Sequence, residues 1–380
     1  MRLSRAALRA HLVDELAPLW ERHGLDRAHG GYWNRLGPGL APMPDGFKRL
    51  LVHARQLYSF SRAAELGAGA WAGAAASHGL DFLVRCFWDP RHGGWFTTTS
   101  DSGEPLDRRK DLYGHAFAIF ALAEHHRISG EPESHRLSRA TLALVRDRLR
   151  DAKHGGYFEA AAEDWQPLAQ PRRQNPHMHL FEALLSLQAV APAEGALSEA
   201  AAILELLASR WSDPATGALG ELFGPDWQVA SGEPGEIVEP GHGFEWFALL
   251  ERFVELGGDR RARGLADRLI GFAERHGVDA DGGVFDQIAR GGESLSSGKR
   301  LWPQMERLKA LAVQVRAREG HRRDTLEAAL AHCAGRYIDP ETRGWREQLA
   351  RDGRVLSSAQ NATSVYHVVA AFGEVLRVAD

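Results

Sequence analysis

Apolar residues recur at three- and four-residue intervals through most of the chain, which is the period of an amphipathic α-helix. Two sets of segments carry this pattern and alternate along the sequence. The first set comprises Arg49–Leu66, Asp111–Ile128, Pro176–Val190, Pro240–Leu256, Pro303–Arg316 and Thr363–Val378. The second set comprises Trp71–Phe87, Glu133–Leu149, Leu197–Trp211, Arg261–His276, Arg322–Tyr337 and, at the start of the chain, Leu3–Glu21. The pattern predicts twelve helices in six pairs.

A short glycine motif separates successive pairs. Three segments, His29–Trp33, His92–Phe96 and His154–Phe158, read His-Gly-Gly followed by two aromatic residues, and Asp281–Phe285 is a weaker copy. Including degenerate copies near residues 220 and 344, the counterpart glycines stand at 31, 94, 156, 220, 283 and 344. Because glycine adopts a positive φ at little cost, the motif predicts tight turns or short hairpins.

Evenly spaced two-helix units are typical of a repeat fold. The N-terminal helix can pair with the first-set helix of the last repeat, so we expect the array to close on itself. The predicted fold is all-α, a closed (α/α)6 toroid of six helical hairpins with an inner and an outer ring of helices. An open superhelix is the alternative, although such arrays usually have shorter repeats of about 34–47 residues. No linker or charge block divides the chain, so residues 1–380 are expected to form one domain.

Composition narrows the function classes. Of 380 residues, 46 are Lys or Arg and 50 are Asp or Glu, and this near-balance argues against a nucleic-acid binder. Cys86 and Cys333 are too few for a disulfide framework or a four-cysteine zinc site. No apolar run approaches the roughly 18 residues of a membrane span. Met1–Trp20 lacks the apolar core of a signal peptide, so we expect a cytoplasmic protein.

Polar and aromatic side chains gather where the first-set helices begin. A toroid has a funnel at one end, and ligands tend to bind in such concave places. Histidine occurs near this level in five of the six repeats although the chain has only 18, and some of these could be core or capping residues. The residues at this level are His53, Arg55, Tyr113, His115, Asn175, His177, His179, His242, Glu245, Trp246, Trp302, Gln304, Glu306, Tyr366 and His367.

The most specific local pattern is His242-x-x-Glu245, which His179-x-x-Glu182 repeats. Spacing i,i+3 places both side chains on one helix face, where the carboxylate can orient the imidazole and raise its basicity. A solvated surface pair is the alternative, but the adjacent Trp246 favours a pocket. His177 and His179 diverge by about 200° on a helix, so at most one faces a ligand, and His179 shares the His-x-x-Glu register.

Basic pairs precede four first-set helices, namely Lys48-Arg49, Arg109-Lys110, Arg172-Arg173 and Lys299-Arg300. They either bridge to acids of neighbouring repeats, the interpretation we favour, or form a rim that attracts an anionic sugar. The histidines could ligate zinc only from separate helices without a recognised ligand spacing, so no metal is expected. Phosphate-binding and dinucleotide-binding glycine motifs are also missing, so no cofactor is expected.

The same residues carry a family resemblance. The segments are Ala54-Arg55-Gln56, Asp111-Leu112-Tyr113, Arg173-Gln174-Asn175-Pro176-His177-Met178-His179, Glu239-Pro240-Gly241-His242-Gly243-Phe244-Glu245-Trp246, Arg300-Leu301-Trp302-Pro303-Gln304 and Tyr366-His367. In order and in register with the repeats, they resemble the N-acylglucosamine 2-epimerase family over nearly the whole chain. The resemblance implies a six-fold α/α barrel without a catalytic metal, and sugar 2-epimerase or aldose–ketose isomerase activity on sugars such as mannose or sulfoquinovose.

The resemblance also implies roles for individual residues. His242 and His367 are the implied acid/base pair, and Glu245 supports His242. The implied sugar contacts are Arg55, Tyr113, Asn175, His179 and Trp302, to which we add Trp246 and Gln304 from the same helix beginnings. The chain departs from the family at Gly243, where many members have histidine or a bulkier residue.

The side chains suggest a reaction. A neutral imidazole is a suitable base near pH 7 for taking the proton beside an aldehyde, which produces an enediolate. The dipole at the helix start is expected to keep His242 neutral, and Arg55 can stabilise the oxyanion. We favour isomerisation of a free aldohexose, D-mannose to D-fructose. The alternatives are a 2-epimerase, an inverting glycoside hydrolase or lyase, and a non-catalytic sugar-binding module. The protein could also form a homodimer.

Overall fold

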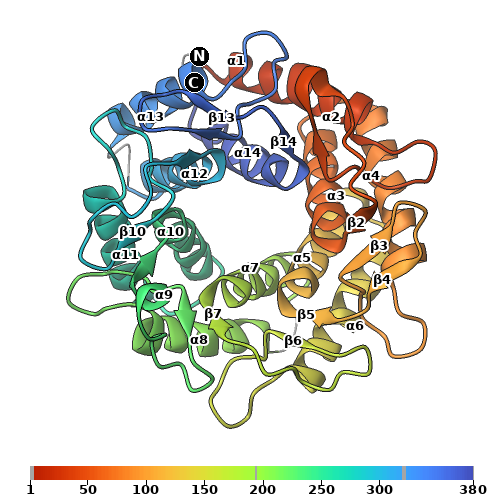
Figure 1. Cartoon of the computed structure of the whole chain (residues 1–380), viewed down its shortest axis with the longest axis horizontal. Helices are drawn as coiled ribbons and strands as arrows, with labels where there is room; N and C mark the ends of the chain where they lie inside the picture. The colour runs from red at the N-terminus through yellow and green to blue at the C-terminus, as the bar shows by residue number, and fades with distance from the viewer. Residues whose placement is uncertain (1–3, 193–194, 319–321, 380) are drawn as a thin grey trace.

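Six inner helices surround a common axis (Figure 1). The computed structural model describes residues 4–192, 195–318 and 322–379. The inner helices are α3 (Leu50–Glu65), α5 (Leu112–Ser129), α7 (Gln174–Val190), α10 (Pro240–Glu255), α12 (Leu301–Ala317) and α14 (Ala362–Val375). Each coincides within a few residues with a first-set segment, so the prediction of a mostly helical chain is confirmed.

Outer helices pack against the inner ones, one for each repeat. They are α4 (Ala70–Phe82), α6 (Pro132–Arg148), α8 (Ala196–Leu206), α11 (Ala262–His276), α13 (Arg323–Arg336) and, from the N-terminal segment, α1 (Arg5–Ala10) and α2 (Ala17–Gly24). π-helical segments extend three of them, at His11–Leu16, Leu83–Phe87 and Leu207–Trp211. Leu3, the predicted first residue of the N-terminal helix, lies outside the described residues. None of the described helices is long and apolar enough to span a membrane.

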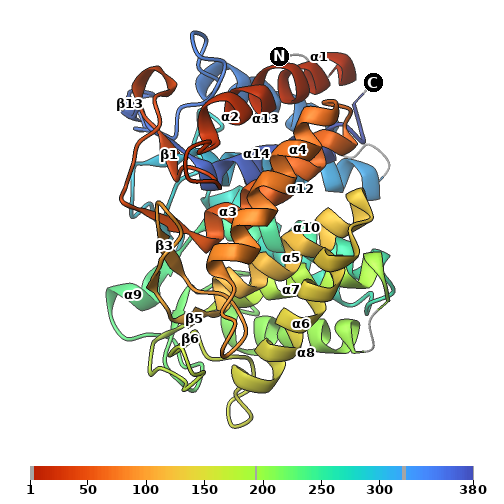
Figure 2. The same ribbon diagram turned by 90° about the vertical axis from the view of Figure 1, so that its right-hand side faces the viewer.

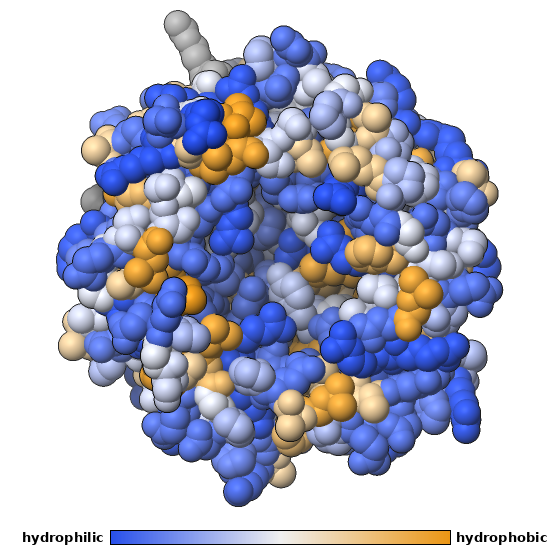
Figure 3. Space-filling model, viewed as in Figure 1, coloured by the Kyte–Doolittle hydropathy of each residue, from blue (hydrophilic) through white to orange (hydrophobic). Residues whose placement is uncertain are grey.

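Short antiparallel strand pairs connect neighbouring repeats, and the all-α prediction missed them. The pairs are β2 (Phe47–Arg49) with β3 (Thr98–Ser100), β5 (Lys110–Asp111) with β6 (Ala160–Ala161), β7 (Arg172–Arg173) with β8 (Leu222–Phe223), β9 (Ile237–Val238) with β10 (Ile288–Ala289), β11 (Lys299–Arg300) with β12 (Gln348–Leu349), and β1 (Arg35–Leu36) with β14 (Gln360–Asn361). β4 (Pro105–Asp107) and β13 (Val355–Ser357) extend two of these sheets. The β1–β14 pair joins the first repeat to the last. The strands of the described residues lie at one end of the helices (Figure 2), and the face at that end is hollowed at its centre (Figure 3).

Each glycine motif forms a tight turn that an aspartate and a buried cation hold together. In the second repeat, Asp89 accepts the N–H groups of Arg91 and His92 and receives the ammonium of Lys110 at 2.8 Å. Lys110 is fully buried. The equivalent ion pairs are Lys48–Asp26, Arg172–Asp151 and Lys299–Asp279. Each of these four cations therefore neutralises the turn of its own repeat, whereas the favoured interpretation expected acids of neighbouring repeats. Arg300 does reach such an acid, Glu239, at 3.4 Å.

A buried histidine at the fourth position of three inner helices fastens the turn to the helix. His115 Nε2 accepts the N–H of Trp95 at 3.0 Å, and its Nδ1 donates to the carbonyl of Asp111 at 2.7 Å. With one nitrogen accepting and the other donating, the ring is neutral. Burial lowers its pKa to about 3, which reinforces that state. His53 and His177 make the same two bonds in the first and third repeats.

Gln304 takes the same place in the fifth repeat. Its Oε1 accepts the N–H of Val284 at 2.7 Å, and its Nε2 donates to the carbonyls of Val284 and Arg300. The side chain is 2% exposed. Gln304 therefore secures a turn, and its predicted role as a sugar contact is wrong.

We predict that His115→Ala lowers the free energy of unfolding by about 1–3 kcal/mol, because the N–H of Trp95 stays buried without its acceptor. His115→Gln should cost less, since glutamine serves at this position in the fifth repeat. Urea unfolding followed by circular dichroism measures both. Equal losses for the two variants would contradict the proposed role of the acceptor.

Candidate active site

Side chains at the sixth position of the inner helices form a closed ring. They are Arg55, Phe117, His179, Glu245, Glu306 and His367, and all are buried. Sixth-position residues diverge by about 200° from the fourth-position residues that hold the turns, so they lie on the other face of each helix. His177 binds a turn and His179 lies in this ring, as the spacing predicts.

Contacts run around the ring from helix to helix. The Arg55 guanidinium lies 4.2 Å from the ring of Phe117, which lies 4.3 Å from the imidazole of His179. His179 Nε2 is 4.0 Å from Glu245. Oxygen atoms of Glu245 and Glu306 and a nitrogen of His367 lie within 4.8 Å of one another. His367 Nε2 returns to Arg55 at 3.3 Å.

His242, the third residue of α10, lies between two carboxylates. Its Nδ1 donates to Glu221 at 2.9 Å, and its Nε2 is 3.8 Å from Glu239. Burial alone would lower the pKa of His242, but Glu221, Glu239 and Glu245 outweigh burial and raise it to about 9. The ring is thus an imidazolium at neutral pH. The prediction that the helix dipole keeps His242 neutral is wrong. The full negative charges of two nearby carboxylates outweigh the partial positive charge at the start of the helix.

The hydrogen-bonded support of His242 differs from the predicted one. Glu221, just before β8, makes the bond assigned to Glu245, whereas no hydrogen bond joins Glu245 to His242 among the described residues. Gln174 Nε2 donates to Glu221 at 2.8 Å, and Gln174 Oε1 accepts the indole N–H of Trp246 at 2.8 Å. Trp246 is fully buried, and its indole orients this series of hydrogen bonds. The prediction that Trp246 contacts the sugar is therefore wrong.

His367 has the opposite electrostatic environment. Its Nδ1 donates to Glu306 at 2.6 Å, which leaves the Nε2 lone pair facing Arg55. Burial lowers the pKa of His367 to about 4, aided by the charges of Arg55 and Lys309 and opposed by Glu306. His367 is therefore neutral where His242 is charged.

The indole of Trp302 lies close to both His242 and His367. Its ring centre lies 5.0 Å from that of His242 and 5.7 Å from that of His367. A proton donor and a proton acceptor thus lie beside the same indole, although their helices are two repeats apart.

Further polar groups complete the site. Arg55 donates to the Tyr113 hydroxyl at 2.9 Å and to the carbonyl of Thr363 at 3.1 Å. Asn175, the second residue of α7 as Tyr113 is of α5, has a buried Oδ1 without a hydrogen-bond partner among the described residues. Such an acceptor is suited to a ligand hydroxyl.

Gly243, the residue at which the chain departs from many family members, packs against Ala273 and Leu269 of α11. This position therefore faces away from the site.

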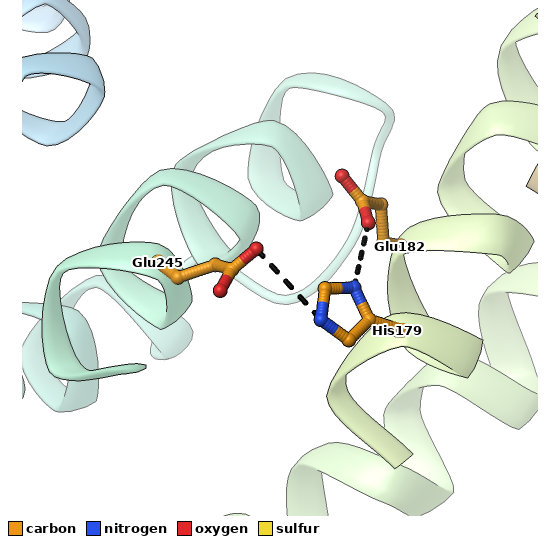
Figure 4. Close-up of side chains that lie close together, drawn as sticks. All are labelled: His179, Glu182 and Glu245. Carbon is orange, nitrogen blue, oxygen red and sulfur yellow. Dashed lines mark hydrogen bonds and ion pairs between the residues drawn. The ribbon is translucent and has the colours of Figure 1, made fainter. Parts of the chain in front are cut away.

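His179 lies between two carboxylates of different helices (Figure 4). Its Nδ1 donates to Glu182 at 3.0 Å, confirming the i,i+3 pair, and Glu182 also accepts the Tyr366 hydroxyl at 2.6 Å. Burial and the charge of Glu306 raise the pKa of Glu245 to about 8.

Two acidic clusters have donor atoms close enough for a metal ion, His179–Glu182–Glu245 and Glu245–Glu306–His367. Lys309 lies against the second cluster, with its Nζ 2.5 Å from Glu306 and 3.8 Å from Glu245. These carboxylates raise the pKa of the buried ammonium against the effect of burial. The lysine therefore supplies the positive charge that the second cluster needs.

The chain is similar to several known proteins. The family model for N-acylglucosamine 2-epimerase matches residues 31–371. A mannose-6-phosphate isomerase of Rhizobium meliloti (strain 1021) is 33% identical over 98% of this chain and 96% of its own length. A D-mannose isomerase of Thermobifida fusca is 30% identical over 58% of this chain and 56% of that protein. The structure of a cellobiose 2-epimerase from Spirochaeta thermophila DSM 6192 has a TM-score of 0.89 and 27% identity, covering 98% of this chain and 96% of that chain.

We predict that His242 keeps its second proton up to about pH 9 and that His367 stays neutral down to about pH 4. Glu221→Gln should lower the pKa of His242, because burial then opposes the charged ring with less compensation. Imidazole ¹⁵N shifts measured across a pH titration report both states.

Glu182→Gln is the matched control, since it removes a buried carboxylate bonded to His179 instead. A wild-type pKa of His242 below about 7, or equal effects of both variants on it, would contradict this electrostatic description.

Proposed function

The chain belongs to the N-acylglucosamine 2-epimerase family, and we propose that it is a sugar isomerase interconverting a free aldohexose and its ketose, with D-mannose and D-fructose as the pair. The observation that carries this proposal is the pair of histidines of opposite protonation that both lie beside Trp302. Groups whose environments drive their pKa values apart take the acid and base roles in a proton transfer. The relatives named as isomerases of mannose or mannose 6-phosphate support this choice of sugar.

The geometry supports a proton-transfer sequence through an enediol. His367 Nε2 takes the proton from C2 of the open-chain sugar while the imidazolium of His242 protonates the C1 oxygen, giving the cis-enediol. His367 then returns its proton to C1, and His242 takes the proton of the C2 hydroxyl, which produces the ketose and restores both rings. Arg55 stabilises negative charge on the sugar oxygens during transfer. A positioned acid or base typically contributes about 10²–10⁴ in rate.

The main alternative is 2-epimerisation, and the cellobiose 2-epimerase relatives favour it. Both reactions share the enediol and differ only in whether the proton returns to C1 or to the opposite face of C2. An inverting glycoside hydrolase needs two carboxyl groups about 6.5–9.5 Å apart. Glu245 and Glu306 approach within 4.8 Å and face histidine and lysine, so we favour proton transfer.

We also propose that the site works without a metal ion, because Lys309 already balances Glu306 and Glu245. A closed (α/α)6 toroid is the fold we propose, supported by the β1–β14 pair and by the structural neighbours. The cytoplasmic location and the homodimer stay predictions.

We predict that the protein converts D-mannose to D-fructose in D₂O, with NMR of the products as the measurement. Glucose in place of fructose would identify a 2-epimerase. Conversion of mannose 6-phosphate with mannose left unchanged would contradict the free-sugar proposal. Dialysis against EDTA should leave the rate unchanged, and a lost rate restored by a divalent cation would contradict the metal-free proposal.

We further predict that His242→Ala and His367→Ala each lower kcat by about 10²–10⁴ or more while circular dichroism stays that of the wild type. His115→Gln is the matched control, since it replaces a histidine that is equally buried but fastens a turn. Turnover near the wild-type rate in either alanine variant would refute the acid/base assignment.

A further inference from the structure

The residue before each inner helix contributes to a ring of side chains at the strand end of the barrel, the hollowed face of Figure 3. We call these residues the cap ring. In chain order they are Arg49, Asp111, Arg173, Glu239, Arg300 and Asn361. The cap ring reaches the active site, because the carboxylate of Glu239 lies 3.8 Å from His242 Nε2.

Two arginines of the cap ring act on the acidic cap residue of the preceding repeat. The guanidinium of Arg300 lies 3.4 Å from the carboxylate of Glu239. Arg173 stands in the same relation to Asp111, where burial raises the pKa of the carboxyl and the charge of Arg173 opposes that effect. Negative and positive charges therefore alternate through these four positions.

Arg49 has no such partner. Helix α14 packs against α3, so the cap residue that precedes Arg49 around the barrel is the neutral Asn361. Asp45 raises the pKa of Arg49 against the larger effect of burial, but the two oxygen atoms of Asp45 bond Arg35 and Asn34. The Nε of Arg49 is buried without a hydrogen-bond partner among the described residues. Its guanidinium is thus available to a ligand.

Other polar atoms without partners lie on the same side of the active site. The Nε of Arg55 and the Oδ1 of Asn175 are buried and make no hydrogen bond within the described parts of the chain. The charge of Arg55 adds to burial in lowering the pKa of Arg49, so the two guanidiniums are close to each other. These residues come from α3 and α7, on either side of α5, whereas α10 and α14 carry His242 and His367 (Figure 1).

We propose that Arg49 is a specificity-determining residue that donates to the hydroxyl at the C6 end of the sugar. In the proposed reaction C1 and C2 lie beside His242 and His367, so the remaining hydroxyls extend toward α3, α5 and α7. A guanidinium presents its N–H donors as a rigid fork, and a sugar hydroxyl accepts from it. The identity of the ligand as a sugar rests on the proposed function.

The position of Arg49 has a consequence for selectivity. A site that donates to a substrate hydroxyl disfavours an analogue without that hydroxyl, because the donor then stays unpaired. A sugar that lacks the C6 hydroxyl should therefore be a poorer substrate than D-mannose, and this difference should depend on Arg49.

Steady-state kinetics with D-mannose and 6-deoxy-D-mannose test the proposal. Arg49→Gln should raise KM for D-mannose by about tenfold or more and leave kcat within about threefold, because the contact is the same in the ground state and the transition state. The wild type should prefer D-mannose over the 6-deoxy sugar, and the variant should lose that preference. Arg173→Gln is the matched control, since Arg173 already pairs with Glu159 at 2.9 Å, and its KM should stay near that of the wild type.

Asn361→Asp provides a second variant that keeps every arginine. It places a carboxylate where the alternation of charge lacks one, so KM should rise as it does in Arg49→Gln. Asn361→Ala is its control and should leave KM unchanged. Isothermal titration calorimetry with D-mannitol, an open-chain hexitol that cannot isomerise, measures binding without turnover, and Arg49→Gln should weaken that binding by about tenfold.

Two outcomes overturn the proposal. One is an unchanged KM and an unchanged preference for the C6 hydroxyl in Arg49→Gln. The other is an equal rise of KM in Arg49→Gln and Arg173→Gln, which would indicate a general effect of charge. Binding of D-mannitol that depends on Arg49, together with no turnover of any free sugar, would refute the proposed function alone.

Discussion

The bond between a glycine turn and a side chain at the fourth position of an inner helix sets the level of this site. In three repeats a neutral histidine receives the turn N–H, and in the fifth a glutamine does so. Because the acceptor stands at the same position in each of these helices, the helices begin at a common height. The sixth positions of these four helices then share a level, and their side chains meet those of Glu245 and His367 from the other two inner helices in one ring.

Buried charge decides what the site can do. Two carboxylates hold His242 as a cation, while burial and the nearby cations hold His367 neutral. Lys309 lies beneath the ring and balances carboxylates that would otherwise repel one another.

Local patterns predicted the helices well because periodicity and glycine turns act over a few residues. The same reasoning separated His177 from His179, since helix geometry alone determines their divergence. It missed strands of two or three residues, whose partners lie about 50 residues away in the chain. It also missed Glu221, which stands 21 residues before His242 in a degenerate copy of the motif and carries no local signal. Trp246 and Gln304 were assigned to the sugar because they share the helix beginnings with true site residues, whereas burial gives them supporting roles.

The amino-acid sequence by itself determined the six repeats, the helix boundaries and the residue types at the level of the funnel, because each follows from interactions between neighbours along the chain. Only the tertiary structure decided which carboxylate bonds which histidine, and therefore which ring is charged. Those pairings join residues from different repeats, and the pKa of a buried group depends on charges brought close by folding.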